Sequence, residues 1–127
     1  MLEEHFGYVA DRVRLERFHA VIAQAIAAGD RVVDLGCGSG VLGLLCVRAG
    51  AGHVIGVDST PMIEVARETF LRAGLAGRAD FIHGHSHRVE LPEPVDLVIC
   101  DHVGYFGFDY GIVETLADAR RRFLKPG

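Results

Sequence analysis

The chain has 127 residues, half of them apolar and about a quarter charged, which is an ordinary composition for one globular domain. Its formal net charge of −4 gives it no overall basic field, which disfavours binding to nucleic acid or to an anionic membrane. No apolar run approaches the roughly 20 residues that a bilayer-spanning helix needs.

The first 29 residues are expected to form a helical segment in front of the core. Apolar residues recur at helical spacing from about Tyr8 to Ala28, and Gly29 is a natural left-handed cap after them. The predicted buried stripe of this helix consists of Val9, Val13, Val21, Ile22, Ala25 and Ile26.

Strands and helices alternate through residues 30–127. Short apolar strands are predicted at residues 31–35, 53–58, 79–83 and 95–100, and helices at about 40–49, 61–73 and 109–124. This rhythm favours right-handed crossovers between parallel neighbours. The sequence therefore predicts an α/β fold with a doubly wound, mainly parallel, Rossmann-like sheet in a single domain.

The second and the last of these helices carry signals at their ends. Pro61 suits the first turn of the second helix, with Ser59 or Thr60 as its cap. Arginines at positions 120–122 end the last helix, where the dipole favours cations, and we interpret them as a solvated helix end. The buried face of the second helix is predicted to hold Met62, Ile63, Val65, Ala66, Phe70 and Leu71.

The first predicted strand runs into a turn with glycine at positions 36, 38 and 40, and a helix follows. Backbone N–H groups and a helix N-terminus then lie at the carboxyl edge of the sheet, where open α/β folds bind ligands. Gly38, Gly40 and Gly43 also match the Gly-x-Gly-x-x-Gly fingerprint of dinucleotide-binding proteins, which alone is a weak signal.

Asp34, near the end of the first strand, separates two ligand classes. A pyrophosphate would lie near this carboxylate, and two unit charges about 4 Å apart repel by roughly 4 kcal/mol at an effective dielectric of 20. A ligand with an ammonium and a sulfonium but no phosphate is attracted instead, and S-adenosylmethionine is such a ligand. The alternative that Asp34 only caps the turn stays open, because Asp favours turns.

Three predicted strands end at or beside an acid: Asp34, Asp58 and Asp101. The carboxyl ends of parallel strands share one edge, so these carboxylates are expected to converge on one crevice. Asp58 is placed to accept hydrogen bonds from ribose hydroxyls. That role suits a nicotinamide dinucleotide equally well, so Asp58 predicts a nucleoside without choosing the cofactor.

The sequence resembles the class I S-adenosylmethionine-dependent methyltransferases, and more narrowly the cofactor-binding half of the protein arginine methyltransferases. The matching runs lie at residues 33–40, 49–51, 54–58, 89–92, 104–105, 119–120 and 123–127. Upstream, His5, Asp11 and Arg14 keep the spacing of that family's His…Asp-x-x-Arg segment. The resemblance covers nearly the whole chain.

The resemblance implies a role for each matching position. Asp34, Gly36 and Gly38 would hold the methionine moiety, with Arg14 pairing its carboxylate and His5 near the cofactor. The ribose would lie at Asp58, beside which Ser59 is a further candidate, and the adenine at the loop that contains Ser86 and His87. Asp101 falls on the first of two substrate-clamping glutamates and is the candidate catalytic residue, whereas Tyr110 replaces the second.

The implied activity is methyl transfer from S-adenosylmethionine to a nitrogen or oxygen acceptor, either a small molecule or a protein side chain. Loss of the second clamp glutamate weakens arginine as the acceptor. Class I cores have seven strands and only four are predicted here, so we expect a fragment or a sheet that another chain completes; a homo-oligomer is one form of that. An NAD-binding oxidoreductase domain and a non-catalytic cofactor-binding module remain the alternatives.

Two further features bear on metal and compartment. Imidazoles at positions 83, 85 and 87 would share one side of a strand, but Gly84 and Ser86 indicate a loop, so no metal site is predicted. Three cysteines without a Cys-x-x-Cys pair, and an acidic N-terminus without a signal peptide's basic and apolar regions, predict a cytoplasmic protein.

Overall fold

The structure is a computed structural model, and it describes residues 16–100 and 117–126. Four strands form one parallel sheet in the order β3-β2-β1-β4. They are β1 (Arg31–Leu35), β2 (His53–Asp58), β3 (Ala79–His83) and β4 (Leu97–Cys100). The first three have the predicted bounds, and all neighbours pair in parallel, which confirms the predicted fold class.

β4 begins two residues later than predicted because the chain before it pairs elsewhere. Val95 forms an isolated parallel bridge with Leu124, and the Val95 N–H donates to the carbonyl of Phe123 at 2.8 Å. Asp96 then joins the chain to β1, because its N–H donates to the Arg31 carbonyl and its carboxylate accepts the Arg31 N–H, both at 2.8 Å. The end of the chain is thereby attached to the start of β4.

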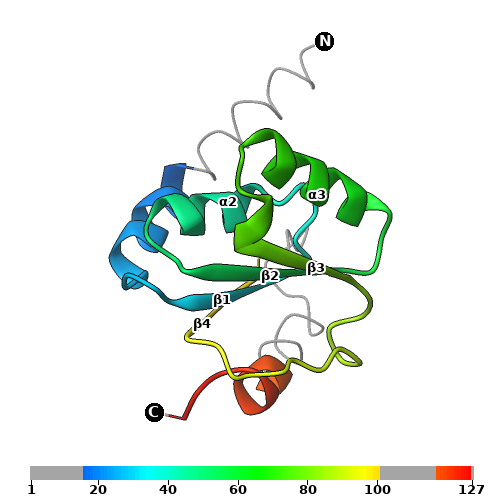
Figure 1. Ribbon diagram of the computed structural model, residues 1–127. Helices are drawn as coiled ribbons and strands as arrows, with labels where there is room; N and C mark the ends of the chain where they lie inside the picture. The colour runs from blue at the N-terminus through cyan, green and yellow to red at the C-terminus, as the bar shows by residue number, and fades with distance from the viewer. Residues whose placement is uncertain (1–15, 101–116, 127) are drawn as a thin grey trace, which may run out of the picture.

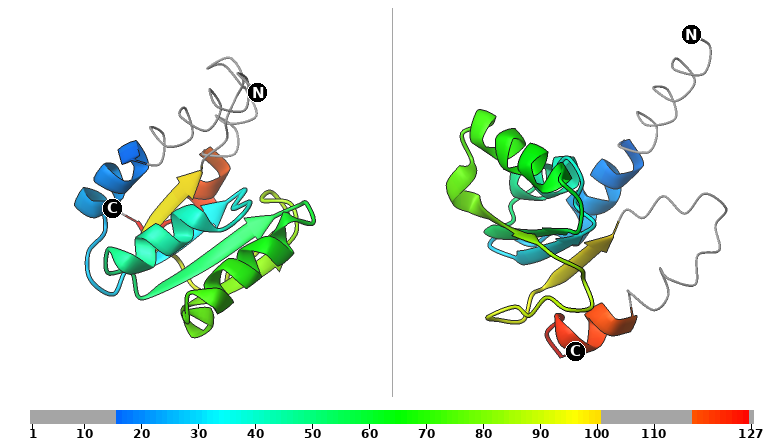
Figure 2. Two further views of the ribbon diagram at one scale, coloured as in Figure 1. Left: turned by 90° about the horizontal axis from the view of Figure 1, so that it is seen from above. Right: turned by 90° about the vertical axis from the view of Figure 1, so that its right-hand side faces the viewer.

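Helices cover both faces of the sheet, giving three layers (Figures 1 and 2). Helices α2 (Val41–Arg48) and α3 (Met62–Arg72) lie on one face together with the helical residues 16–25, and the helical residues 117–122 lie on the other. A short 3-10 helix, η1 (Ala76–Arg78), leads into β3. Within the described residues no helix is long and apolar enough to cross a membrane.

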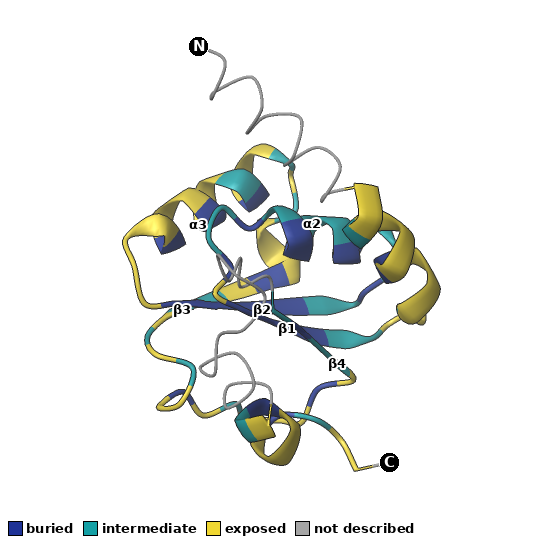
Figure 3. Cartoon of the chain, turned by 180° about the vertical axis from the view of Figure 1, so that it is seen from behind, coloured by how far each residue is buried: buried dark blue, intermediate teal, exposed yellow. Residues whose placement is uncertain are grey.

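Strand alternation divides most of the apolar core between the two faces of the sheet, and a third, smaller cluster holds Cys37, Ile63 and Ala66. One core lies between the sheet and helices α2 and α3, and the other lies between the sheet and residues 117–124, as the dark blue inner surfaces in Figure 3 show. The first contains Val32 and Val54, and the second contains Val33 and Ile55, which are the next residues along β1 and β2. The candidate site lies at the edge of the sheet where the strands have their C-terminal ends.

The two outer helices bury narrower faces than predicted. Helix α3 packs through Ile63, Ala66 and Phe70 only, whose spacing of three and four keeps them on one stripe. Of the predicted stripe of the first helix, Ile22 is buried, Ile26 is partly buried against the core and Ala25 is exposed, whereas Val9 and Val13 lie outside the described residues. A helix lying flat on a sheet contacts it along one stripe, so the prediction was wrong for Val21 (63% exposed), Met62 (41%), Val65 (44%) and Leu71 (61%).

Candidate functional site

The turn after β1 depends on glycines with positive φ. Gly36, Gly38 and Gly40 have φ angles of 68°, 53° and 84°, a region that L side chains rarely adopt. The Gly36 and Cys37 N–H groups both donate to the Val57 carbonyl, at 2.7 and 3.0 Å. The turn is therefore attached to the end of the neighbouring strand β2 by its own backbone.

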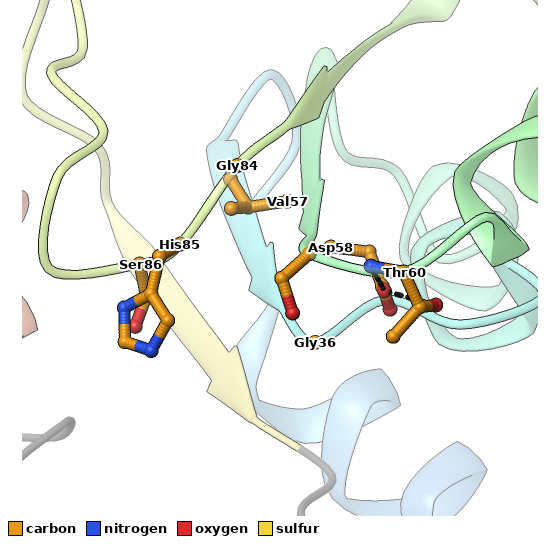
Figure 4. A pocket seen from close by; sticks show the side chains of 8 residues that line it. Gly36, Val57, Asp58, Thr60, Gly84, His85 and Ser86 are labelled. Carbon is orange, nitrogen blue, oxygen red and sulfur yellow. Dashed lines mark hydrogen bonds between the residues drawn. The ribbon is translucent and has the colours of Figure 1, made fainter.

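Asp58 joins this turn to the start of α3. Its Oδ2 accepts the Gly38 N–H at 2.8 Å, and its Oδ1 accepts both the Thr60 N–H at 2.8 Å and the Thr60 hydroxyl at 2.6 Å (Figure 4). Burial to 8% exposure favours the neutral acid, but the bonds from Thr60 and Gly38, together with nearby His83, outweigh it and lower the pKa of Asp58. The carboxylate is ionised at neutral pH.

These bonds decide what the glycine turn offers to a ligand. A phosphate-binding turn directs free N–H groups at the anion. Here the N–H groups of Gly36 and Cys37 point to a carbonyl, that of Gly38 to a carboxylate and that of Gly40 to the Cys37 carbonyl at 2.9 Å. The turn resembles the dinucleotide fingerprint in sequence, but these four donors are already used inside the protein.

A cavity of about 240 Å³ opens beside Asp58 at the carboxyl edge of the sheet. We call its two sides the strand wall (Gly36, Val57, Asp58, Ser59 and Thr60) and the loop wall (Gly84, His85 and Ser86), both drawn in Figure 4. The predicted site residues Gly36, Asp58, Ser59 and Ser86 lie on these walls. The sequence predicted Thr60 only as a possible helix cap. Its hydroxyl accepts the Met62 N–H at 3.2 Å, as a cap does, and it also donates to Asp58 at the cavity wall.

Asp34 lies deeper than predicted. It is 1% exposed and does not line the cavity that the described residues form. A Cβ added to Gly43 of α2 would lie 3.7 Å from its Oδ2, so this carboxylate faces the layer of α2. Asp34 still acts electrostatically on two neighbouring cysteines. Burial, assisted by the negative charge of Asp34, raises the pKa of Cys37 and of Cys46 to about 12.

The loop wall is held by the end of the chain. Arg122 Nη1 donates to the carbonyls of Ser86 and His87, both at 3.1 Å, and Nη2 donates to the carbonyl of Val89. Arg122 is exposed, as the interpretation of the three arginines as a solvated helix end expects, but it also binds the loop, which that interpretation does not include. A charge run at a helix end carries no signal for a contact made more than 30 residues away.

The remaining predicted residues divide into two groups. His87 is described: its Nδ1 lies 3.6 Å from Asp118 Oδ2 and its ring stacks on that of His85, with centroids 5.2 Å apart. His5, Arg14 and Asp101 lie outside the described residues, as does Tyr110, so their roles stay predictions. Among residues 16–100 and 117–126, no group of three or more His, Cys, Asp or Glu side chains is arranged to hold a metal ion.

A parallel sheet with a glycine turn bonded to an acid at the end of the next strand defines a Rossmann-like α/β domain. A family model described as a methyltransferase domain matches residues 32–127, and the chain belongs to this family. Its fold is that of the class I S-adenosylmethionine-dependent methyltransferases, and within that class it resembles the protein arginine methyltransferases.

Individual relatives agree with this assignment. The chain is 35% identical to the probable protein arginine N-methyltransferase 6 of Arabidopsis thaliana over 125 residues, which is 97% of this chain and 29% of that protein. It superposes on Arabidopsis thaliana protein arginine methyltransferase 10 with a TM-score of 0.85 and 31% identity, covering 99% of this chain and 37% of that chain. A Trypanosoma brucei PRMT1 enzyme–prozyme heterotetrameric complex with AdoHcy gives a TM-score of 0.85 and 30% identity, covering 96% and 39%. The chain thus spans roughly a third of the length of these relatives.

Proposed function

We propose that this chain binds S-adenosylmethionine and serves a methyl transfer to a nitrogen or oxygen acceptor. The observation that carries the proposal is the bond from the Gly38 N–H to Asp58 Oδ2. It converts a turn that could cradle a pyrophosphate into one that supports a carboxylate at the cavity wall. A nucleoside with a cationic tail suits such a site, and a dinucleotide does not.

The lone pairs of Asp58 fit a ribose. A carboxylate has about four acceptor positions, and Asp58 uses two on Oδ1 and one on Oδ2 inside the protein. Oδ2 is therefore the oxygen that retains room for a ribose hydroxyl. The lowered pKa of Asp58 keeps that oxygen charged, and a hydrogen bond to a charged acceptor is about twice as strong as a neutral one.

The other assignments follow the order of the site along the sheet edge. In this assignment the methionine moiety lies along Gly36 and Gly38, and Asp34 behind them supplies negative potential. Arg14 would pair with the methionine carboxylate, and His5 would lie near the cofactor. Ser59 stands beside the ribose, and Ser86 and His87 belong to the adenine side. When bound, S-adenosylmethionine supplies a methyl group on a sulfonium, so the protein's share is binding and alignment.

The acceptor is assigned only by chemical class. Asp101 is our candidate for orienting it and for taking its proton. The relatives are named as protein arginine methyltransferases, which makes an arginine side chain of a protein one acceptor to test. Since Tyr110 stands where the resemblance calls for a second carboxylate, a neutral amine or a hydroxyl group is tested beside it.

Calorimetric titration with S-adenosylhomocysteine and with NAD⁺ separates the two ligand classes. We expect the first to bind with a Kd in the micromolar range and NAD⁺ not to bind; binding of NAD⁺ alone would overturn the proposal. Asp58→Ala should abolish most of this affinity. The matched control is Asp80→Ala, because Asp80 is also an acid on an adjacent strand, lies away from the cavity and has a 76% exposed side chain.

Transfer itself is tested with S-adenosylmethionine that carries a labelled methyl group. Acceptors containing a guanidinium, an amine or a hydroxyl are incubated with the chain, and label in any of them supports methyl transfer. A chain that binds the cofactor and labels none of these acceptors is a cofactor-binding module. That result would overturn the catalytic half of the proposal and leave the binding half standing.

A further inference from the structure

The guanidinium of Arg122 is the centre of a contact set that spans two distant parts of the chain. The guanidinium binds three carbonyls of the loop, and its Nη1 also donates to Asp118 Oδ2 at 2.8 Å, one helical turn earlier. Its carbon atom lies 5.0 Å from the centroid of the Phe123 ring, and Phe123 is 1% exposed. Asp118 and Phe123, on the same segment as Arg122, therefore orient the guanidinium toward the loop.

Its neighbour Arg121 shows that this is not a general property of the arginine run. The side chain of Arg121 is 77% exposed and approaches Asp118 at only 3.8 Å, whereas that of Arg122 is 29% exposed. An exposed pair of the first kind contributes little to stability. A planar guanidinium with five donors can bind several carbonyl oxygens at once, as Arg122 does.

Among the described residues, the hydrogen bonds of the loop itself include one from the His87 N–H to His85 Nδ1 at 3.3 Å and three backbone bonds. The Gly84 N–H donates to the Asp58 carbonyl at 3.0 Å, and the N–H groups of Arg88 and Val89 both donate to the His85 carbonyl, at 2.9 and 3.1 Å. These bonds close one turn of the chain. Its carbonyls at positions 86, 87 and 89 are bound by Arg122 instead, from 33 to 36 residues away.

One of the three residues that Arg122 binds also lines the cavity. Ser86 lines the loop wall through its own atoms while its carbonyl accepts from Arg122. Val89, at the far end of the contact, is 7% exposed and packs in the core with Ala119 and Phe123. In Figures 1 and 2 the red turn at the end of the chain lies against the yellow-green segment that contains this loop. The guanidinium therefore connects the loop wall to the helical residues 117–122.

We propose that Arg122, oriented by Asp118, is a positioning residue that fixes the loop wall for the nucleoside part of the cofactor; this rests on the proposed function. Arg122 itself does not line the cavity. It acts by making the binding-competent arrangement of residues 84–89 the main one before a ligand arrives. If that arrangement falls to about a tenth of the population, the apparent Kd rises about tenfold, even though no ligand contact is lost.

The test compares Arg122→Met and Arg122→Lys with the matched control Arg121→Met. Titration with S-adenosylhomocysteine well below each variant's melting temperature should give about tenfold weaker binding for Arg122→Met and a partial recovery for Arg122→Lys. Arg121→Met should bind like the unmodified chain. Amide hydrogen exchange of the ligand-free chain should show lost protection at Arg88 and Val89 in Arg122→Met, with β1 and β2 unchanged.

A purely structural role gives a different pattern. Arg122→Met would then melt at a lower temperature while its Kd stayed within twofold and its loop amides stayed protected, which would overturn the proposal. If Arg122→Met does not fold, Arg122→Gln takes its place, with about threefold weaker binding as the supporting result and an unchanged Kd as the opposing one. If the unmodified chain binds no S-adenosylhomocysteine, the proposed function fails, whereas exchange in the free chain still decides whether Arg122 fixes the loop.

Discussion

The two walls of the cavity are built in different ways. The strand wall consists of residues that neighbouring strands bring together, and backbone groups with glycine φ angles hold it. The loop wall is a short turn whose outer carbonyls depend on the side chain of Arg122, more than 30 residues further on. The strand wall thus combines backbone bonds with one carboxylate from its own residues, Asp58, whereas the loop wall receives its main side-chain contact from outside the cavity, through Arg122.

The first test asks whether the glycine turn beside the strand wall keeps Cys37 buried in solution. Cys37 lies in the glycine turn, is 8% exposed and has a pKa raised to about 12 by burial and by the charges of Asp34 and Asp58. Since only the thiolate reacts, labelling by iodoacetamide at pH 8.5 should be roughly a thousandfold slower than for an ordinary thiol. Mass spectrometry of the peptide that contains Cys37 gives the rate, with the urea-unfolded chain as reference. Labelling within tenfold of that reference would mean that this wall opens readily.

The second test removes the charge of the strand wall. Asp58→Asn keeps the shape, but an amide cannot accept from Gly38 and from Thr60 at the same time. Bonds to a charged group contribute about 1.5–3 kcal/mol, so the affinity for S-adenosylhomocysteine should fall about 10- to 150-fold. An affinity within threefold of the unmodified chain would exclude Asp58 from the ribose site.

The same variant also tests the direction of the Asp58 pKa. A lowered pKa in the folded state means that ionised Asp58 stabilises the fold above the ordinary value of about 4, and that this stability is lost as pH falls through the lowered value. The difference in unfolding free energy between the unmodified chain and Asp58→Asn should therefore be constant from pH 8 to 5 and shrink below pH 4. A difference that shrinks already between pH 7 and 5 would contradict the lowered pKa.

The third test concerns the packing behind the strand wall. A Cβ at Gly56 in β2 would meet the Phe81 ring at 2.6 Å and Cys37 Sγ at 3.1 Å. Gly56→Ala should therefore destabilise the fold by about 1–3 kcal/mol, measured by urea unfolding. The matched control is Gly77→Ala, where a Cβ meets nothing within 4 Å and no positive φ is required. Equal stability of the two variants would show that Phe81 gives way without cost.

The difference between the walls also explains what could be predicted from the sequence. The bounds of β1, β2 and β3 and the site residues Gly36 and Asp58 follow from local patterns: an apolar run, an acid at its end and glycines in the turn. Arg122 could not be found in this way, because its partners are backbone carbonyls, which have no residue signature. Its predicted solvated position was the ordinary expectation for arginine near a helix C-terminus.

Burial was predicted less well than element position for a related reason. Periodicity places Val65 and Leu71 within the apolar arc of α3, but the width of the buried stripe depends on what lies beside the helix, and both side chains remain exposed here. Asp34 shows the opposite error. Its place near the strand end predicted a residue at the crevice, whereas the alternation along β1 turns it toward α2 and buries it.

The smallest effect is expected for Thr60, and it sharpens the comparison most. Thr60→Val removes the hydroxyl donor at 2.6 Å from Asp58, but the carboxylate keeps the N–H groups of Thr60 and Gly38. The affinity for S-adenosylhomocysteine should change by no more than about threefold, because the freed position on Oδ1 can accept a ribose hydroxyl in its place. The pKa of Asp58, measured by NMR titration of its carboxyl carbon, should rise toward the ordinary value and return in Thr60→Ser. A tenfold loss of affinity in Thr60→Val, equal to that expected for Arg122→Met, would mean that both walls depend equally on single side chains.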